Sequence, residues 1–392
     1  MSLITPQEAQ ARMLAEARLL PAEIIPYGAS LGRVLREDLR SDRPFPPFDR
    51  VTMDGIAFRS LDQLPGTPLL VQGTHPAGQP APPPLKPEHC WQIMTGAVLP
   101  PDCDTIVPIE EVTLTESTAL VRGQPTPGSF IHRCGSDAPA GTVVLKSGTR
   151  LGPAHLGLLA TVGATEVKVT RLPCIHVLTT GDELIPVEEI PKPHQLRQSN
   201  GPTLLAAIDL WGPAERTWQH LPDDLESITR AIEAALQEAD LLLLSGGISK
   251  GTRDYVRPAL ESLIGPPVFH GVAQRPGKPL AYWPGVVALP GNPNSTLTTF
   301  QRYVAPLLHR LTGSPEPEPT TLPLVDPVKP HSTLTLFLSA TLAPDGRIRP
   351  LSPQNSGDFL TPLQATGLVE IPPGRDEITT ARYLSISPAR PS

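Results

Sequence analysis

The chain has 392 residues, of which 51 are proline, and its formal net charge at pH 7 is −7. This length exceeds what a single hydrophobic core usually holds, so we expect two to four domains, with rigid turns favoured over long helices. The acidic balance, without a basic block, disfavours nucleic acid as a partner, and the absence of a long apolar run disfavours a membrane span.

The first segment of the chain predicts a helix over residues 5–20. Thr5 is a suitable helix cap, Pro6 occupies the first helical position and Glu8 completes a capping box. Charges occur throughout this segment, unlike in a signal peptide, and the four cysteines form no C-x-x-C pair. We therefore expect a cytoplasmic protein with reduced thiols.

Short apolar stretches broken by proline and glycine follow from 66 to 147 and are typical of a small β-domain. Residues 151–169 predict a short helix and then a strand that rejoins the N-terminal segment. From 174 to 311, strand patterns alternate with helix patterns, which predicts a doubly wound, mostly parallel sheet. A linker rich in proline and charge at 313–321 precedes a small C-terminal β-domain. The fold class is therefore multidomain α/β plus β.

The loops after the predicted strands carry the polar residues. In open α/β sheets, ligands bind beyond the carboxyl ends of the strands. The sequence places glycine- or proline-containing loops there, at 179–183, 221–224, 245–251, 274–278 and 290–295. The acids of this edge are Asp182, Glu183, Asp223, Asp224 and Asp254. Magnesium with a phosphate ligand suits such a spread. Each acid alone is better explained as an exposed charge or a helix cap, the cap above all for Asp223 or Asp224, but five acids at one edge weaken that explanation.

Two of these loops indicate an anion. SGGISKG at 245–251 lacks the Lys-Ser/Thr pair of a phosphate-binding P-loop, yet a glycine-rich loop before a helix still offers backbone N–H groups. The alternative is a glycine turn without a ligand. Arg275 and Lys278 flank a Pro-Gly turn and suit phosphate or an oxyanion, with a solvated turn as the alternative.

Several motifs occur together in one order. They are PPFDRVTMDGIA (46–57), IMTGAVLPPDCDTIVPIEE (93–111), CGSDAPAGTVVLKSGTRL (134–151), TTGDEL (179–184), SGGISKGTRDYV (245–256), RPGKP (275–279) and LPGNPNST (289–296). The chain resembles the molybdopterin molybdenumtransferases, to which the E domain of gephyrin is also similar. The resemblance covers nearly the full length.

The resemblance implies an enzyme that inserts molybdate into adenylylated molybdopterin with Mg²⁺ and releases AMP. It implies an elongated homodimer with a composite active site, which could dock with molybdopterin adenylyltransferase. The implied parts are an elongated linker and dimerisation domain (1–43 and 146–170), a β-rich insert (44–145), a doubly wound α/β molybdopterin-binding domain (171–312) and a C-terminal β-barrel-like domain (319–392).

The resemblance also assigns roles to residues. Asp54 would reach the neighbouring subunit's cleft, lined from the same side by Thr95 and Asp137. The remaining implied catalytic residues are Glu183, Asp223, Asp254 and Lys278, and the implied metal ligands are Asp54, Glu183 and Asp223. The implied cofactor-binding residues are Thr95, Thr180, Gly181, Ser245, Gly246, Gly247, Arg275, Pro290, Ser295 and Ser356.

Some positions depart from the pattern of the family. Ser136, Arg275 and Ser339 stand where glutamate, lysine and arginine are common, and Val51-Thr52 and Ile56 flank the MDG motif at 53–55 in place of Ser-Ala and tyrosine. These departures leave two other hypotheses open. One is a non-catalytic pterin-binding or scaffold paralogue, and the other is a nucleotide enzyme similar to molybdopterin adenylyltransferase.

Overall fold

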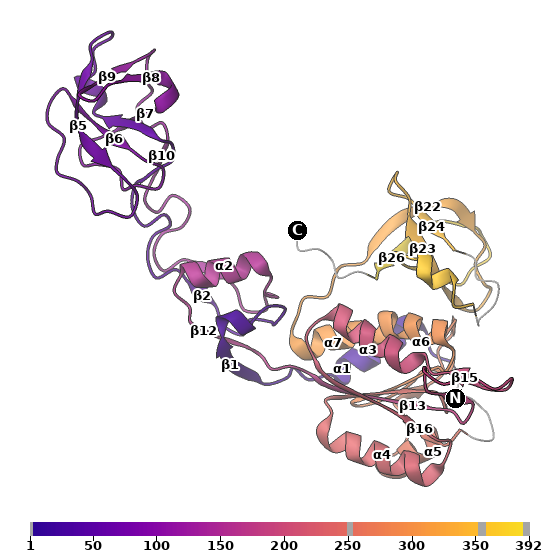
Figure 1. Ribbon diagram of the computed structural model, residues 1–392. Coiled ribbons are helices and arrows are strands. Elements are labelled where there is room, and N and C mark those ends of the chain that lie inside the picture. Colours follow the sequence, from indigo (N-terminus) through magenta and orange to yellow (C-terminus); the bar gives the residue numbers. More distant parts are fainter. Residues whose placement is uncertain (1–2, 249–253, 352–357, 387–392) are drawn as a thin grey trace. The chain divides into compact units, whose positions relative to one another are not determined.

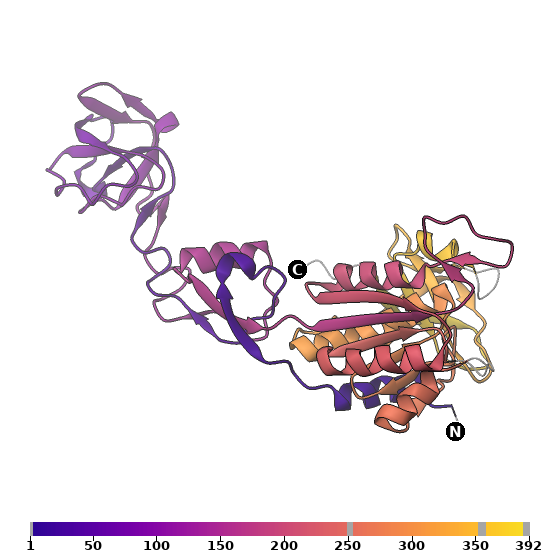
Figure 2. The same ribbon diagram turned by 60° about the horizontal axis from the view of Figure 1, so that its bottom comes forward.

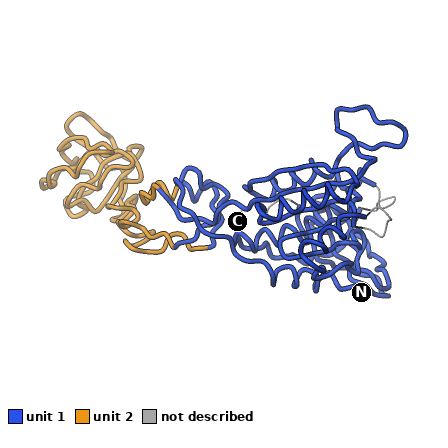
Figure 3. The backbone as a smooth tube through the Cα atoms, turned by 90° about the horizontal axis from the view of Figure 1, so that it is seen from below, with its two compact units in different colours: residues 1–37, 148–156, 166–392 blue, residues 38–147, 157–165 orange. Residues whose placement is uncertain are grey.

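The structure is a computed structural model that describes residues 3–248, 254–351 and 358–386. It divides into two compact units (Figure 3). The first unit comprises residues 1–37, 148–156 and 166–392, and the second comprises 38–147 and 157–165. Within the described ranges, every helix is too short or too polar to cross a membrane. The division into four parts remains a prediction.

A six-stranded sheet forms the centre of the first unit (Figure 1). Its strand order is β16 (Glu215–Leu221), β13 (Cys174–Thr180), β17 (Leu241–Ser245), β21 (Val286–Leu289), β20 (Ala281–Trp283) and β18 (Phe269–His270). The first four strands are parallel, and β20 and β18 are antiparallel additions. The predicted doubly wound sheet is confirmed.

Helices cover both faces of this sheet (Figure 2). The helices are α3 (Asn200–Trp211), α4 (Leu225–Glu238), α5 (Val256–Ile264), α6 (Pro293–Thr299) and α7 (Ala305–Thr312). Along β17, Leu241 and Leu243 pack into the core with α3 and α7, whereas Leu242 and Leu244 pack into the core with α4 and α5. The unbroken leucine run of this strand is therefore buried on both sides.

The N-terminal helix belongs to the same core. α1 (Pro6–Glu16) is capped by Thr5, whose hydroxyl oxygen accepts from the backbone N–H of Glu8 at 3.1 Å. Ala9 and Met13 are buried in the cluster that contains the α3 and α7 residues. The capping pattern predicted the start of this helix, but nothing in the sequence indicated where it packs.

The last helix pattern of the region 174–311, at residues 295–311, is not one continuous α-helix. A π-helical turn, η4 (Phe300–Val304), lies between α6 and α7, and the N–H of Ala305 bonds to the carbonyl of Phe300. Pro306 has no N–H for the carbonyl four residues earlier, which belongs to Arg302. The wider turn accommodates that missing bond.

The C-terminal strands close into a barrel. They are β22 (Thr320–Val328), β23 (Thr335–Leu342), β24 (Ile348–Pro350), β25 (Gly367–Ile371) and β26 (Ile378–Ser385). The short turn η5 (Thr361–Gln364) lies between β24 and β25 in the chain. Because β23 pairs with both β24 and β25, the five strands form a ring. A short strand, β19 (Gln274–Arg275), joins β23 in parallel and ties the barrel to the α/β region.

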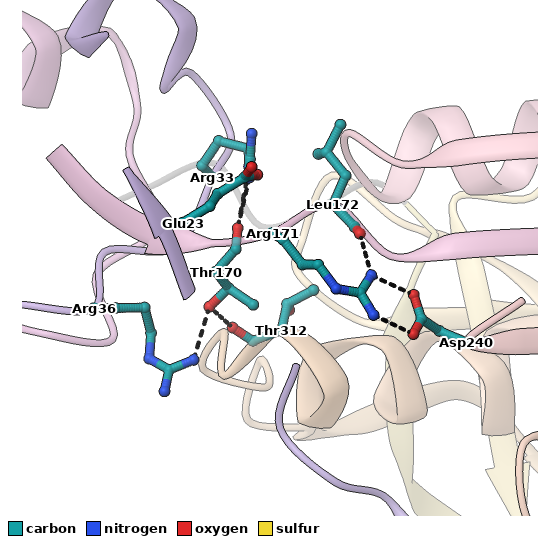
Figure 4. A network of polar contacts seen from close by, with 8 residues as sticks. All are labelled: Glu23, Arg33, Arg36, Thr170, Arg171, Leu172, Asp240 and Thr312. Atoms are coloured by element: carbon teal, nitrogen blue, oxygen red, sulfur yellow. Dashed lines mark hydrogen bonds and ion pairs between the residues drawn. The ribbon is translucent and has the colours of Figure 1, made fainter. Parts of the chain in front are cut away.

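A two-stranded ribbon precedes the α/β sheet. β1 (Ala22–Pro26) pairs antiparallel with β12 (Glu166–Thr170), as expected for a strand that rejoins the N-terminal segment. The short turn η1 (Tyr27–Ala29) and α2 (Pro153–Thr161) complete this region. Figure 4 shows that Thr170 donates to the Thr312 carbonyl at 2.8 Å, while Arg171 pairs with Asp240 through both guanidinium Nη atoms. These bonds fix the ribbon to the end of α7 and to the start of β17.

The second unit contains a six-stranded sheet of its own. Its order is β7 (Thr105–Pro108), β4 (Gly55–Phe58), β6 (His89–Ile93), β5 (Leu69–His75), β9 (Thr118–Val121) and β8 (Val112–Leu114), with the short turns η2 (Ser60–Asp62) and η3 (Ile109–Glu111). Two strand pairs flank it: β2 (Leu39–Arg40) with β11 (Val143–Leu145), and β3 (Arg50–Val51) with β10 (Ile131–His132). The predicted β-rich character of this region is confirmed.

Candidate active site

The carboxyl ends of the parallel strands lie in register at one edge of the sheet. Thr179 on β13 is opposite Ser245 on β17, and Ser245 is opposite Leu289 on β21. Thr180 is opposite Leu221, the last residue of β16. The loops that follow these four strands therefore start side by side, as predicted for a ligand-binding edge.

Two glycines bring these loops into close contact. Gly246 has a φ of +102°, and a Cβ atom there would lie 2.8 Å from the carbonyl oxygen of Thr180. At Gly247, with a φ of +63°, a Cβ atom would lie 2.7 Å from a methyl group of Val256. Larger residues would push the loops apart, so the glycines have a steric role.

Ser245 is a buried tie between loops. Its side chain is 2% exposed, accepts from Nδ2 of Asn200 at 2.9 Å and donates to the Pro290 carbonyl at 3.2 Å. Asn200 also donates to the carbonyl of Gly291, and Thr296 donates to the Pro290 carbonyl at 2.6 Å. The hydroxyl of Ser245 thus holds the PGNPNS loop against β17.

Asp182 and Asp223 face each other across two loops. The N–H of Asp223 donates to the Asp182 carboxylate at 3.0 Å, and the N–H of Asp182 donates to that of Asp223 at 3.3 Å. Burial, together with the charges of Asp182 and Glu183, raises the pKa of Asp223 above its ordinary value, against the lowering effect of the Asp182 N–H. The Glu183 carboxylate lies over Gly181, where a Cβ atom would meet its oxygens at 3.0 and 3.1 Å. This corner accumulates negative charge that a cation would relieve.

The other two acids of the edge differ from this group. The side chain of Asp224 caps α4 by accepting from the N–H of Ser227 at 2.8 Å, so the helix-cap interpretation holds for this residue. Asp254 is half-buried and lies two residues before the start of α5. Among the described residues, no three His, Cys, Asp or Glu side chains form a ready-made metal-binding group.

Arg275 and Lys278 are exposed on the turn between β19 and β20. The peptide bond between Arg275 and Pro276 is cis, and Gly277 has a φ of +87°. Ser295 lies in the first turn of α6 and is buried, with its N–H bonded to the capping Asn292 side chain at 3.4 Å.

In the second unit, the structure brings Asp54 and Thr95 together. One carboxylate oxygen of Asp54 accepts from both the N–H of Thr95 (2.6 Å) and its hydroxyl (2.7 Å), and these bonds lower the pKa of Asp54. Asp137 bonds to the His132 ring at 2.7 Å, which lowers the pKa of Asp137. Both carboxylates are exposed and ionised near neutral pH.

Some candidates lie outside the described residues, and some polar residues were not predicted. Ser356, together with Lys250 and Arg253 of the SGGISKG loop and its continuation, falls in the ranges that are not described. Sequence reasoning missed Asn200, the first residue of α3, whose only signal was its place directly after the polar pair Gln198-Ser199.

Comparisons with known proteins agree with this architecture. Residues 4–163 match the family described as "MoeA N-terminal region (domain I and II)", and residues 176–310 match "Probable molybdopterin binding domain". The chain is 36% identical to the molybdopterin molybdenumtransferase of Synechocystis sp. over 88% of this chain and 89% of that protein. The chain belongs to the molybdopterin molybdenumtransferase family.

Further members of the family are similar over most of their length. The Synechococcus elongatus molybdopterin molybdenumtransferase is 34% identical over 93% of this chain and 94% of that protein. A crystal structure of the molybdopterin biosynthesis MoeA protein from Pyrococcus horikoshii OT3 superposes with a TM-score of 0.83 at 25% identity, covering 98% of this chain and 99% of that one. Both the α/β sheet and the second unit are therefore parts of the family's fold.

Proposed function

We propose that this molybdopterin molybdenumtransferase family member inserts molybdate into adenylylated molybdopterin and releases AMP, acting as a cytoplasmic homodimer. The observation that carries the proposal is the register of Thr179, Ser245 and Leu289. This register collects two glycine-lined loops and an acidic corner at one sheet edge. The choice of molybdopterin and molybdenum as substrates rests on the names of the relatives.

The phosphate of the pterin substrate is assigned to the loop at Gly246 and Gly247, between the ends of β13 and β17. Their lack of side chains lets an anion approach the backbone closely. The same loops are bordered by Thr180, Gly181 and Pro290. The buried hydroxyl of Ser245 holds the loop at Pro290 through its hydrogen bond to the Pro290 carbonyl. Asp254 is assigned to the acidic side of the cleft.

Molybdate is assigned to Lys278, Arg275 and Ser295. A dianion beside a phosphate is strongly repelled, so cationic side chains are required to hold it there. Arg275 retains the charge of the lysine that is common in the family, while its fork of donors suits two oxygen atoms of an oxyanion. Ser339 contributes no charge at the position where arginine is common.

A magnesium ion fits the corner of Glu183 and Asp223. Both carboxylates belong to loops that adjoin each other through Asp182. Magnesium commonly takes one or two carboxylates and completes its shell with phosphate and water, so a preformed group of three acids is not required. When bound, the ion would neutralise charge on the phosphate that loses AMP. Asp54 is proposed to approach from the neighbouring subunit, with Thr95 fixing its carboxylate and Asp137 beside it.

The deciding experiment measures AMP release from adenylylated molybdopterin by the purified full-length chain. We expect release only when molybdate and Mg²⁺ are both present, and a loss of about 100-fold in Lys278→Ala, which removes a charge from the oxyanion site. Arg230→Ala, an exposed arginine on α4, serves as the matched control. A parallel series with tungstate reports oxyanion preference.

Other outcomes would identify a different function. Tight pterin binding without AMP release would contradict the transferase and support a scaffold paralogue. ATP consumption by the protein alone would instead support a nucleotide enzyme. A pull-down with purified molybdopterin adenylyltransferase tests whether the two enzymes dock.

A further inference from the structure

The turn that carries Arg275 and Lys278 is held from inside by a buried glutamine. Gln274 is 1% exposed, and its Nε2 donates to the carbonyl oxygens of Pro276 at 3.1 Å and of Gly277 at 3.3 Å. The base of the same loop is closed by the N–H of Val272, which donates to the Lys278 carbonyl at 2.9 Å. One amide side chain therefore satisfies two carbonyl groups of the turn.

These partners fix the orientation of the Gln274 amide. Carbonyl oxygens only accept hydrogen bonds, so the NH₂ group must face Pro276 and Gly277, and Oε1 must face away from them. There Oε1 accepts from the hydroxyl of Tyr303. Tyr303 is 1% exposed, and burial raises its pKa, so its phenol stays protonated as the donor.

The two residues come from different parts of the fold. Gln274 lies on β19, which pairs with β23 of the barrel, whereas Tyr303 lies in the π-helical turn before α7. The turn is also confined sterically, because a Cβ atom at Gly277 would lie 2.5 Å from the methyl group of Thr299. Hydrogen bonding and packing thus connect the turn to the helix whose first turn carries Ser295.

We propose that Gln274 and Tyr303 are positioning residues for the oxyanion-binding turn. Both side chains are buried, so they would act on the substrate only through the turn. Tyr303 orients the amide of Gln274, and that amide holds the backbone from which Arg275 and Lys278 project. Long cationic side chains on an unsupported turn would lose part of the geometry that an oxyanion requires. This inference rests on the proposed assignment of molybdate to that turn.

The test compares two buried tyrosines. Tyr303→Phe removes only the donor to Gln274, whereas Tyr282→Phe removes an equally buried hydroxyl that donates to the Met13 carbonyl at 3.4 Å. We expect Tyr303→Phe to raise the KM for molybdate about tenfold with little change in the KM for the pterin. Tyr282→Phe should leave both constants unchanged. An unchanged KM for molybdate in Tyr303→Phe would overturn the inference.

A double variant tests whether the two residues act as one chain of contacts. Gln274→Met keeps the length of the side chain and removes its hydrogen bonds. If Tyr303 acts only through Gln274, the double variant Tyr303→Phe/Gln274→Met should raise the KM for molybdate no further than Gln274→Met alone. Independent, additive increases would contradict the proposed order of action.

Hydrogen exchange gives a readout that does not depend on activity. The N–H groups of Val272 and Leu280 bond to the carbonyls of Lys278 and Gly277, so a loosened turn exposes them. We expect about tenfold faster exchange at these two amides in Tyr303→Phe and unchanged exchange in Tyr282→Phe. One outcome is that exchange rises in Tyr303→Phe while the wild-type chain releases no AMP with molybdate. In that case the assigned reaction is wrong, but the role of Gln274 and Tyr303 in holding the turn is confirmed. Unchanged exchange refutes the positioning role.

Discussion

At the scale of single residues, the acidic corner shows two neighbouring aspartates with opposite behaviour. Burial and the charges of Asp182 and Glu183 raise the pKa of Asp223. Backbone and side-chain hydrogen bonds from Ser227 lower the pKa of Asp224, the cap of α4. The sequence alone did not separate these two residues, because either could precede the helix. Because Asp224 is occupied as a helix cap, Asp223 remains the proposed metal ligand of the pair.

This difference predicts a pH dependence for magnesium binding. A proton competes with the ion for Asp223, and a raised pKa lets it compete above the ordinary aspartate range, which lies near pH 4. The affinity for Mg²⁺, measured by calorimetry between pH 4 and 8, should therefore fall towards the acid end of the range. Asp223→Asn should bind about tenfold more weakly at pH 8 and lose that dependence.

Asp224→Asn is the matched control for this experiment, since asparagine also caps a helix well. It should reproduce the wild-type curve. A wild-type affinity that stays constant over the whole pH range would remove Asp223 from the metal site.

Buried polar residues were the part of the site that sequence patterns missed. The loops and their exposed charges were predictable, because glycine, proline and acids follow recognisable strand patterns. Asn200 and Gln274 were not, because each buried amide has a partner distant in sequence, the carbonyl of Gly291 for Asn200 and the hydroxyl of Tyr303 for Gln274. Only the fold brings those partners together.

At the scale of elements, the alternation of strand and helix was predictable and its interruptions were not. The double-sided burial of β17 follows from its leucine run. The π-helical turn before Pro306 depends on how the chain compensates for a missing N–H, which has no sequence signature of its own. The same holds for α1, whose cap is visible but whose packing partner lies nearly 300 residues away.

The close approach of Gly246, just after β17, to Thr180 at the end of β13 predicts a strong effect of Gly246→Ala. The added methyl group combines a positive φ with a contact of 2.8 Å to the Thr180 carbonyl. We expect a loss of about 2–3 kcal/mol in the free energy of unfolding and at least about tenfold weaker pterin binding. Urea denaturation and a pterin titration measure the two effects.

Gly285→Ala is the control that separates the cost of a positive φ from the cost of the close contact at Gly246. Its φ is +78°, but the nearest atom to an added Cβ is 3.8 Å away. This variant should lose only about 1 kcal/mol and keep full pterin affinity. Equal losses in both variants would show that the contact with Thr180 has no special role.

At the scale of the whole molecule, the proposed composite site predicts complementation between inactive variants. If Asp54 serves the neighbouring subunit's Asp223, then Asp54→Ala and Asp223→Asn block a site from opposite sides. After the two proteins are unfolded and refolded together, half of the dimers are mixed, and each mixed dimer has one intact site. AMP release should recover to about a quarter of the wild-type rate. Absence of recovery, with mixed dimers demonstrated by mass spectrometry, would place both residues in one subunit's site.

The second unit interrupts the first, and this has a consequence for how the protein is made. The strands of residues 38–147 pair only among themselves, so we expect this part of the second unit to fold before the first unit is complete. The first 26 residues cannot, because β1 requires β12 and α1 requires the core that includes α7. These residues are thus synthesised before the second unit but packed after it, and the face of α1 that carries Ala9 and Met13 stays uncovered until residue 311 has been made.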